Sequence, residues 1–523
     1  MNRKWYRVIL RRRLVVALLI IAQLAFIIYS VIAWSKYYTV IRTVLTVVSL
    51  VVSLCILTRR EKGAYKMTWI FVILLLPLFG GLFYLFIHMQ SSSRRLNRRQ
   101  EQLSEITRPL YGLDGVADDA YKRAADSDPR QLTQIRYLRD FAGFPVYPDT
   151  EAVYLSPGEE KFDCLLRELK KAKRYIFLEY FIIHEGLMWD TILDILREKV
   201  AEGVEVRVLY DDVGCFLTLP KNYPETLRSY GIKCTVFNPF RPVLSTMQNN
   251  RDHRKIVSID GVVAFTGGVN LSDEYINARP RFGHWKDAAI VLRGPAAWSM
   301  TLMFLEMWSL TRRKGDKNGQ IDEDFRQYMP RSFPALMVPD SGLGFVQPYC
   351  DSPMDNENVG EHVYLNILDH ARDYVYISTP YLIVDDSMIS ALSLAAKSGV
   401  DVRIITPHTP DKRLVHSTTR SYYRDLIASG VRIYEYSKGF IHSKTFVSDD
   451  CVATVGTTNL DFRSLYTNFE CGACLYGSPA VAEIKRDYLT TLEECQEITL
   501  EDCRDNFFVR VWHSILRLCA PLM

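Results

Sequence analysis

The stretch "HRKIVSID" (residues 253–260) decides the fold, because its polar pattern occurs a second time further along the chain. His253, Lys255 and Asp260 interrupt a run that is otherwise largely apolar, and "HSKTFVSD" (residues 442–449) repeats the same residue types at the same spacing. Residues two apart on a strand share a face, so each histidine is expected beside its lysine. One such triplet alone suggests a solvated strand edge followed by a turn, whereas two copies indicate a functional site.

The repeat extends beyond these two stretches and predicts a duplicated body. "GVEVRVL" (203–209) matches "GVDVRII" (399–405), and "DAAIVLRG" (287–294) matches "ECGACLYG" (470–477). Strand-like segments alternate with helix-like ones, which is typical of an α/β architecture. We therefore predict two similar α/β lobes, packed pseudo-symmetrically, at residues 136–335 and 336–500.

In each lobe a helix is expected between two strands. The predicted elements are strands 174–183 and 204–212 around helix 188–202, and strands 374–383 and 400–407 around helix 385–398.

Length and charge separate an N-terminal region from this body. A chain of 523 residues is too long for one ordinary core. Residues 1–100 hold 16 Lys and Arg and one acidic residue, whereas the remainder holds 48 basic and 59 acidic residues. An acidic body argues against a nucleic-acid partner. The eleven cysteines show no disulfide-scaffold spacing, which favours reduced thiols.

The N-terminal region, residues 1–100, is predicted to associate with a membrane through apolar segments 14–34, 38–57 and 67–87. Six basic residues precede the first segment and favour a cytoplasmic N-terminus. Residues 101–135 are expected to form a linker, and residues 501–523 an amphipathic tail. The tail suits either a helix on the bilayer surface or a helix that closes the second lobe.

The loops of this region leave two topologies open. The N-terminus and the loops around residues 58–66 and 94–99 are all basic, and three full spans cannot place all of them on one side. Two spans plus a third segment broken at "PLFGG" (77–81) satisfy the rule and put the body on the cytoplasmic side of the membrane. The alternative is three plain spans with an external body.

The repeated residues suit chemistry at a phosphodiester without a metal or another cofactor. A neutral histidine is a nucleophile toward phosphorus, and a protonated one is a general acid for the leaving oxygen. Lysines and the amides of Asn270 and Asn459 would hold phosphate oxygens. Asp287 and Glu470 fill equivalent places in the repeat and are candidates to orient the imidazoles.

Both motifs resemble those of the phospholipase D superfamily, whose HxKxxxxD signature is followed by Gly-x-x-Asn. "HRKIVSIDGVVAFTGGVN" and "HSKTFVSDDCVATVGTTN" both fit, although Gly267-Gly268 and Gly456-Thr457 stand where the family usually has Gly-Ser. "NLDFRSLYTNFE" (459–470), "FGHWKDAAIVLRGP" (282–295) and the apolar N-terminal segments resemble the bacterial cardiolipin synthase branch. The resemblance covers nearly the whole chain.

This resemblance implies phosphatidyl transfer through a phosphatidyl-histidine, from one phosphatidylglycerol to another, which gives cardiolipin and glycerol. By analogy the site residues are His253, Lys255, Asp260, His442, Lys444 and Asp449. His253 is expected to be the nucleophile and His442 the general acid and then base, although the two copies are nearly equivalent. Asp260 and Asp449 are expected to hold the turns of the motifs.

Several rival functions share these features. A hydrolytic phospholipase D, a phosphatidylserine synthase and a nuclease would use the same site, and a membrane scaffold would carry it without activity. The acidic body and the membrane segments disfavour the nuclease, and two intact motifs disfavour the scaffold. Glu179, within "FLEYF", is expected either at the mouth of the site or in a buried ion pair.

Overall fold

The computed structural model describes most of the chain as two compact units. The described residues are 25, 38–59, 62–76, 80–88, 92–112, 115–127, 129–240, 248–312, 323–331, 342–355 and 357–522. The first unit comprises Met1–Arg95, Phe240–Asn249 and Ser514–Met523, and the second comprises Leu96–Pro239 and Asn250–His513. The predicted segment 14–34 lies outside the described residues apart from residue 25.

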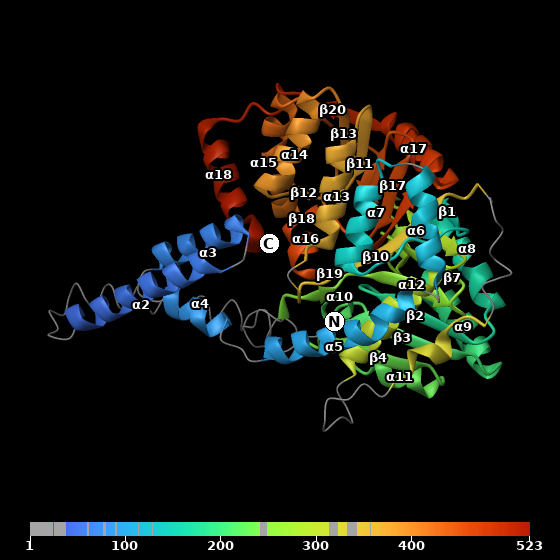
Figure 1. The fold of residues 1–523 in the computed structure, drawn as a ribbon. Coiled ribbons are helices and arrows are strands. Elements are labelled where there is room, and N and C mark those ends of the chain that lie inside the picture. Colours follow the sequence, from blue (N-terminus) through green and yellow to red (C-terminus); the bar gives the residue numbers. More distant parts are fainter. Residues whose placement is uncertain are drawn as a thin grey trace. The chain divides into compact units, whose positions relative to one another are not determined.

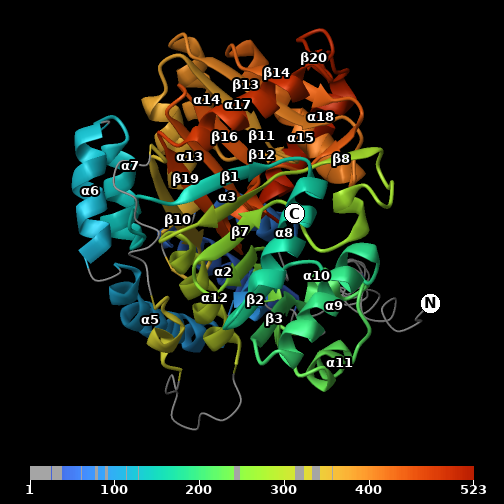
Figure 2. The same cartoon turned by 90° about the vertical axis from the view of Figure 1, so that its right-hand side faces the viewer.

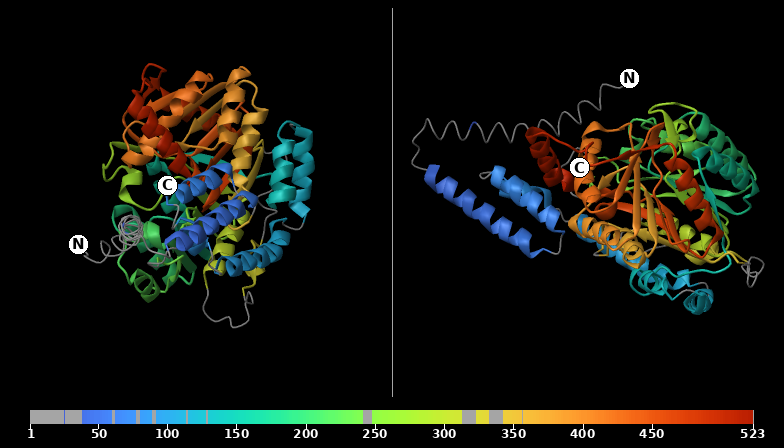
Figure 3. Two further views of the ribbon diagram at one scale, coloured as in Figure 1. Left: turned by 90° about the vertical axis from the view of Figure 1, so that its left-hand side faces the viewer. Right: turned by 90° about the horizontal axis from the view of Figure 1, so that it is seen from above.

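Three helices of the first unit lie side by side (Figure 3): α2 (Tyr38–Thr58), α3 (Gly63–Leu75) and α4 (Gly80–His88). They enclose a small core in which Trp69 packs edge-on against Tyr84 at 5.1 Å. The segment predicted at 67–87 is thus two helices, as its Pro-Gly break suggested. Gly80 permits the close approach, because a Cβ there would lie 2.6 Å from the Cα of Ile73. Within the part of the chain that the structure covers, no helix has both the length and the apolar character needed to cross a bilayer.

The second unit is built on two mixed sheets, one in each lobe (Figure 1). The first has the order β1 (Glu151–Leu155), β9 (Ala289–Arg293), β7 (Val263–Gly267), β6 (Lys255–Ile259), β2 (Tyr175–Tyr180), β3 (Glu205–Asp211) and β4 (Lys233–Phe237). The second has the order β10 (Phe345–Asp351), β19 (Asn468–Tyr476), β17 (Val452–Gly456), β16 (Thr445–Ser448), β11 (Tyr374–Ser378), β13 (Asp401–Pro407), β14 (Arg432–Tyr436) and β20 (Cys495–Ile498).

The first seven strands of the second sheet repeat the order of the first sheet. Strands β2, β3 and β4 of the first sheet are parallel, as are β11, β13 and β14 of the second. The next strand on the other side, β6 beside β2 and β16 beside β11, is antiparallel in both sheets. The two-lobed α/β fold expected from the repeat is therefore confirmed, whereas the exact lobe boundaries stay a prediction. Two expected strands are shorter: β2 ends at Tyr180, and β11 ends at Ser378, before Pro380. After β11, β12 (Leu382–Ile383) pairs instead with β18 (Leu460–Asp461).

Helices cover these sheets, and two of them link the lobes. In the first lobe they are α8 (Gly158–Lys171), α9 (Leu187–Ala201), α10 (Asp212–Cys215), α11 (Tyr223–Ser229) and α12 (Ala297–Thr311). In the second they are α13 (Val359–His370), α14 (Asp386–Lys397), α15 (Arg413–Ala428), α16 (Phe462–Tyr466) and α17 (Pro479–Leu492). α12 also packs on β10, and α17 also packs on β1, so each lobe supplies one helix to the other lobe's edge strand.

The remaining helices lie before the first lobe and after the second. They are α5 (Ser92–Tyr111), α6 (Val116–Ser127), α7 (Leu132–Arg136) and the C-terminal α18 (Phe507–Cys519). Figure 2 shows α5, α6 and α7 on the opposite side of the second unit from α9 and α11.

Candidate active site

A short strand pairing across the lobes positions the first histidine. β5 (Arg251–Asp252) of the first lobe runs parallel to the start of β19 in the second, with Asp252 opposite Phe469. The amide of His253 then donates to the carbonyl of Phe469 at 3.0 Å. His253 therefore stands beside Glu470, the next residue of the second lobe's strand.

A second short strand pairing across the lobes positions His442, the other histidine. β15 (Gly439–Ile441) of the second lobe runs parallel to β8 (His284–Lys286) of the first. The amide of His442 donates to the carbonyl of Lys286 at 2.7 Å. His442 is thereby placed beside Asp287 of the first lobe.

Each histidine consequently pairs with a carboxylate of the opposite lobe. Nδ1 of His253 lies 2.9 Å from both carboxylate oxygens of Glu470, and Nδ1 of His442 lies 2.7 Å from Oδ2 of Asp287. Both carboxylates are fully buried, whereas the histidines keep 8–9% of their surface exposed, so a ligand has access to the rings. A hydrogen bond from Nδ1–H to the carboxylate leaves the Nε2 lone pair of a neutral imidazole free for chemistry.

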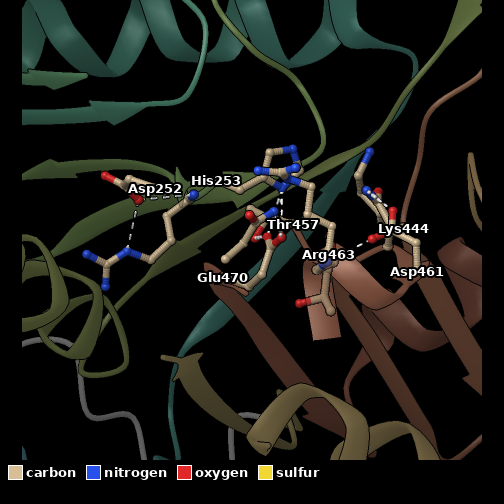
Figure 4. A network of polar contacts seen from close by, with 12 residues as sticks. Asp252, His253, Lys444, Thr457, Asp461, Arg463 and Glu470 are labelled. Atoms are coloured by element: carbon tan, nitrogen blue, oxygen red, sulfur yellow. Dashed lines mark hydrogen bonds and ion pairs between the residues drawn. The ribbon is translucent and has the colours of Figure 1, made fainter. Parts of the chain in front are cut away.

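The motif lysines are buried next to the histidines that precede them. Nζ of Lys255 donates to the carbonyl of His253 at 2.6 Å, and Nζ of Lys444 donates to the carbonyl of His442 and lies 2.9 Å from its Nδ1. Figure 4 shows Lys444 beside Asp461, and His253 above Glu470 and Thr457. Two ammonium groups in one buried site form a strong attraction for an anion.

Burial and these charges set the protonation of the site. Burial, opposed by Glu470 and reinforced by Lys255, lowers the pKa of His253 to about 4. Burial and Lys444 lower the pKa of His442 to about 3. Burial also lowers the pKa of Lys255 to about 8 and that of Lys444 to about 7. Both imidazoles are therefore neutral near pH 7.

The two motifs share one electrostatic environment. The charge on Lys444 of the second lobe contributes to lowering the pKa of His253, after burial and the nearer groups. Lys255 of the first lobe contributes in the same way to the pKa of His442. The structure thus brings together the six charged or imidazole groups that the sequence placed in two lobes: His253, Lys255, Glu470, His442, Lys444 and Asp287.

The lobes differ in how they hold their carboxylates. Oγ1 of Thr457 donates to Oε2 of Glu470 at 2.5 Å. The equivalent residue of the first lobe is Gly268, where a Cβ would lie 2.0 Å from Oδ1 of Asp287. The shorter Asp287 carboxylate accepts instead from the amide of Ala288 at 2.8 Å. The sequence places Thr457 directly after the motif's glycine, but it does not predict that this hydroxyl holds Glu470.

The motif aspartates lie away from the histidines and organise the sheet. Asp260, at a φ of 54°, accepts from the backbone amides of Lys173, Arg174 and Tyr175, which lead into β2. Asp449, at a φ of 51°, accepts from the amides of Arg372, Asp373 and Tyr374, which lead into β11. This geometry supports the expectation that both aspartates hold turns, and places neither beside an imidazole.

The two asparagines expected at phosphate are engaged with protein groups. Oδ1 of Asn270 accepts from the amide of Ile182, and Nδ2 donates to the hydroxyl of Tyr275 at 2.8 Å. Nδ2 of Asn459 donates to Asp461 at 3.0 Å, and its Oδ1 has no hydrogen-bond partner. The ring of Tyr275 lies 5.5 Å from that of His442, so a chain of contacts connects Asn270 to the site through this tyrosine.

Glu179 forms the buried ion pair that was one of its two expected roles. Its Oε1 lies 2.6 Å from Nε of Arg254, and both side chains are buried. Among the described residues, no group of three or more His, Cys, Asp and Glu side chains is arranged to hold a metal ion.

Comparison with known protein families identifies both lobes. A family model described as "Cardiolipin synthase, PLD-like domain" matches residues 165–288 and again residues 364–491. A second model, described as "Phospholipase_D-nuclease N-terminal", matches residues 44–87. The two matched lobe segments each contain one histidine motif and one of the two carboxylates.

Several relatives align along nearly their whole length. A cardiolipin synthase of Geobacillus sp. (strain WCH70) is 36% identical over 467 residues, which are 89% of this chain and 90% of the relative. Cardiolipin synthase 2 of Bacillus anthracis is 35% identical over 91% of this chain and 90% of its own. An uncharacterized protein of Streptococcus mutans serotype c is 43% identical over 87% of this chain and 96% of its own.

A solved structure supports the fold independently. The crystal structure of phosphatidylserine synthase from Haemophilus influenzae Rd KW20 superposes with a TM-score of 0.54, covering 71% of this chain and 95% of that one at 14% identity. At that identity the similarity concerns the fold alone. With the two matched lobes and the long alignments above, the chain belongs to the cardiolipin synthase family of phospholipase D-like proteins.

Proposed function

We propose that this chain is a cardiolipin synthase, which transfers a phosphatidyl group from one phosphatidylglycerol to a second. The observation that carries the proposal is the pair of neutral, carboxylate-bound histidines flanked by two buried lysines. This arrangement offers a nucleophile and an acid–base partner around one anion. The choice of phosphatidylglycerol as substrate rests on the relatives named cardiolipin synthase. The phosphoryl transfer itself rests on the histidines and lysines of the site.

In the first half-reaction Nε2 of His253 attacks the phosphorus of phosphatidylglycerol. A P–N bond forms as the P–O bond to the glycerol headgroup breaks, and the imidazolium of His442 gives its proton to the departing glycerol oxygen. Because the pKa of His442 is low before substrate binds, this proton is taken up when the phosphodiester anion binds and raises that pKa. Lys255 and Lys444 neutralise the charge that develops on the phosphoryl oxygens.

In the second half-reaction a headgroup hydroxyl of another phosphatidylglycerol is the acceptor. His442, now neutral, removes the proton of that hydroxyl, whose oxygen attacks phosphorus as the P–N bond to His253 breaks. Cardiolipin leaves, and both imidazoles return to their starting state once the proton on His442 is released. Glu470 and Asp287 stabilise the cationic forms of the rings throughout.

The test is purified protein with phosphatidylglycerol labelled in its headgroup. Free glycerol and cardiolipin in equal amounts are expected. Phosphatidic acid as the main product would mean a hydrolase, and phosphatidylserine formed from an activated diacylglycerol and serine would mean the phosphatidylserine synthase reaction. If none of these lipids is turned over, the remaining function is that of a membrane scaffold without catalytic activity.

We propose further that the chain is a multi-pass protein of the bacterial cell membrane, with its catalytic body on the cytoplasmic side. The basic loops of residues 1–100 support this orientation. An Asp119→Cys variant, in a background whose exposed or partly exposed native cysteines are serine, should resist an impermeant thiol reagent in intact cells and react after permeabilisation. Labelling in intact cells would contradict this orientation.

A further inference from the structure

The C-terminal helix α18 exposes an apolar side of unusual size for a helix on a protein surface. Phe508 is 81% exposed, Trp512 48%, and Val511 and Ile515 43% each. Of the thirteen residues of α18, Leu516 alone is buried. A soluble helix rarely leaves two large aromatic side chains and two aliphatic ones in water together. The helix therefore does not close the core of the second lobe, which was one of its two expected roles.

The other sides of α18 have a different character. Residues 508, 511, 512 and 515 fall on one side at helical spacing, and Arg510 and Arg517 fall on the opposite side. The covered side includes His513, whose Nδ1 lies 2.8 Å from Asp505, and Leu516. Helix α18 therefore packs against the protein through the side that carries His513 and Leu516, and its apolar side faces outward.

The end of α18, from Ser514 onward, belongs to the first unit, whose helices also expose apolar side chains. That unit contains α2, α3 and α4, and Oγ1 of Thr68 in α3 donates to the carbonyl of Leu518 at 2.7 Å. The exposed apolar side chains of these helices include Leu50 at 61%, Leu54 at 55% and Leu74 at 72%. Two distant parts of the chain therefore join in one unit that displays apolar surface.

We propose that α18 is an interfacial helix that lies on the lipid bilayer, with Phe508, Trp512 and Ile515 in the boundary between headgroups and acyl chains. Aromatic side chains favour that boundary, and arginines on the opposite side of such a helix stay in water. The choice of a bilayer over a second protein copy rests partly on the proposed function, because a phosphatidyltransferase must reach substrate in a membrane.

Fluorescence of Trp512 tests its location without using activity. The full chain and a Trp512→Phe variant are reconstituted in vesicles of phosphatidylglycerol and phosphatidylethanolamine, and the difference between their spectra isolates Trp512 among the eight tryptophans. Lipids brominated near the top of the acyl chains should quench roughly half or more of this difference, as expected for an interfacial aromatic. Quenching by aqueous acrylamide but not by brominated lipid overturns the proposal, and so does resistance to both, which a second copy of the chain would produce.

A kinetic comparison tests whether the contact serves catalysis. The double variant Phe508→Ser/Trp512→Ser should raise the apparent KM for phosphatidylglycerol in vesicles about 5- to 10-fold, while kcat on monomeric short-chain phosphatidylglycerol stays unchanged. Leu394→Ser is the matched control, since Leu394 is a single apolar side chain, 65% exposed, on α14. An unchanged KM in the double variant overturns a role in substrate access.

The two measurements separate this inference from the proposed function. If the chain makes no cardiolipin but bromolipid quenches Trp512, the function fails and the interfacial helix stands. If cardiolipin forms and Trp512 remains accessible to acrylamide alone, the function stands and the interfacial helix fails.

Discussion

Nδ1 of His442 lies 2.7 Å from Oδ2 of Asp287, and the two residues belong to different lobes. His253 and Glu470 form the reciprocal pair, in which the histidine comes from the first lobe and the carboxylate from the second, with Nδ1 2.9 Å from Oε1. Strand pairings of two and three residues between the lobes, β5 with β19 and β8 with β15, fix both contacts. The orientation of each imidazole is therefore a property of the interface and not of either lobe.

Removing a carboxylate should impair the histidine of the other lobe. Glu470→Gln and Asp287→Asn are each expected to lower kcat about 100-fold, in the range seen when a partner that orients a functional histidine is lost. Nitrogen NMR of labelled histidines gives the sharper readout: Glu470→Gln should change the tautomer and pKa of His253 and leave His442 nearly unchanged. A change in tautomer and pKa that is confined to His442 would contradict the pairing of Glu470 with His253.

The assignment of nucleophile and acid–base can be checked by trapping. In His442→Asn the departing glycerol lacks its acid and the acceptor lacks its base, so turnover should fall by at least about 1,000-fold. Any slowly formed phosphatidyl adduct should then be found on the peptide that contains His253. His253→Asn should give no adduct, and an adduct on His442 in that variant would reverse the two roles.

The pH dependence should follow the lysines. Burial lowers the pKa of Lys444 to about 7 and that of Lys255 to about 8. A lysine loses its charge above its pKa, so attraction for the phosphodiester weakens, and kcat/KM should decline as the pH rises through this range. Below about pH 4 the nucleophile His253 becomes protonated, because burial places its pKa there, and kcat/KM should fall again.

Substitution by arginine provides the control for the alkaline decline. Lys444→Arg keeps its charge at every pH used, so the part of the decline that belongs to Lys444 should disappear even if the rate at pH 7 is lower. An unaltered alkaline limb in this variant would show that another group controls it.

The motif aspartates should affect stability more than chemistry. Asp260→Ala loses three hydrogen bonds to backbone amides and puts alanine at a positive φ, for a loss of about 2–3 kcal/mol in the free energy of unfolding. Asp260→Asn keeps an acceptor and tolerates that φ, so its loss should be smaller. Activity per folded molecule should be retained in both, and a fall in kcat without a fall in Tm would assign Asp260 to the chemistry.

The difference between Gly268 and Thr457 makes a further prediction. Gly268→Ser, the residue usual in the family, places a Cβ against Asp287 and should lower kcat about 10- to 100-fold through the His442 pair. Thr457→Ser keeps the hydroxyl that donates to Glu470 and should be mild, whereas Thr457→Val removes it and should be more severe. Equal activity of Thr457→Ser and Thr457→Val would show that this hydroxyl does not position Glu470.

The sequence was sufficient for the repeat, the histidine motifs and both carboxylates, because these depend on spacing within one lobe. Which histidine Glu470 would serve could not be predicted, since the answer depends on two short strand pairings between lobes that leave no periodic pattern. The role of Asn270 was equally inaccessible: its amide is held by Ile182 and Tyr275, and such contacts depend on packing. Glu179 had two expected roles because only the position of Arg254 in space decides between them.

The exchange of carboxylates also bears on the origin of the chain. A single ancestral lobe could have completed neither histidine–carboxylate pair alone, and two identical lobes in an isologous dimer would have completed both at once. Within one polypeptide the two halves need not be identical. Gly268 beside Asp287 in one half, and Thr457 beside Glu470 in the other, are differences that a homodimer cannot hold, and they give the two imidazoles separate environments.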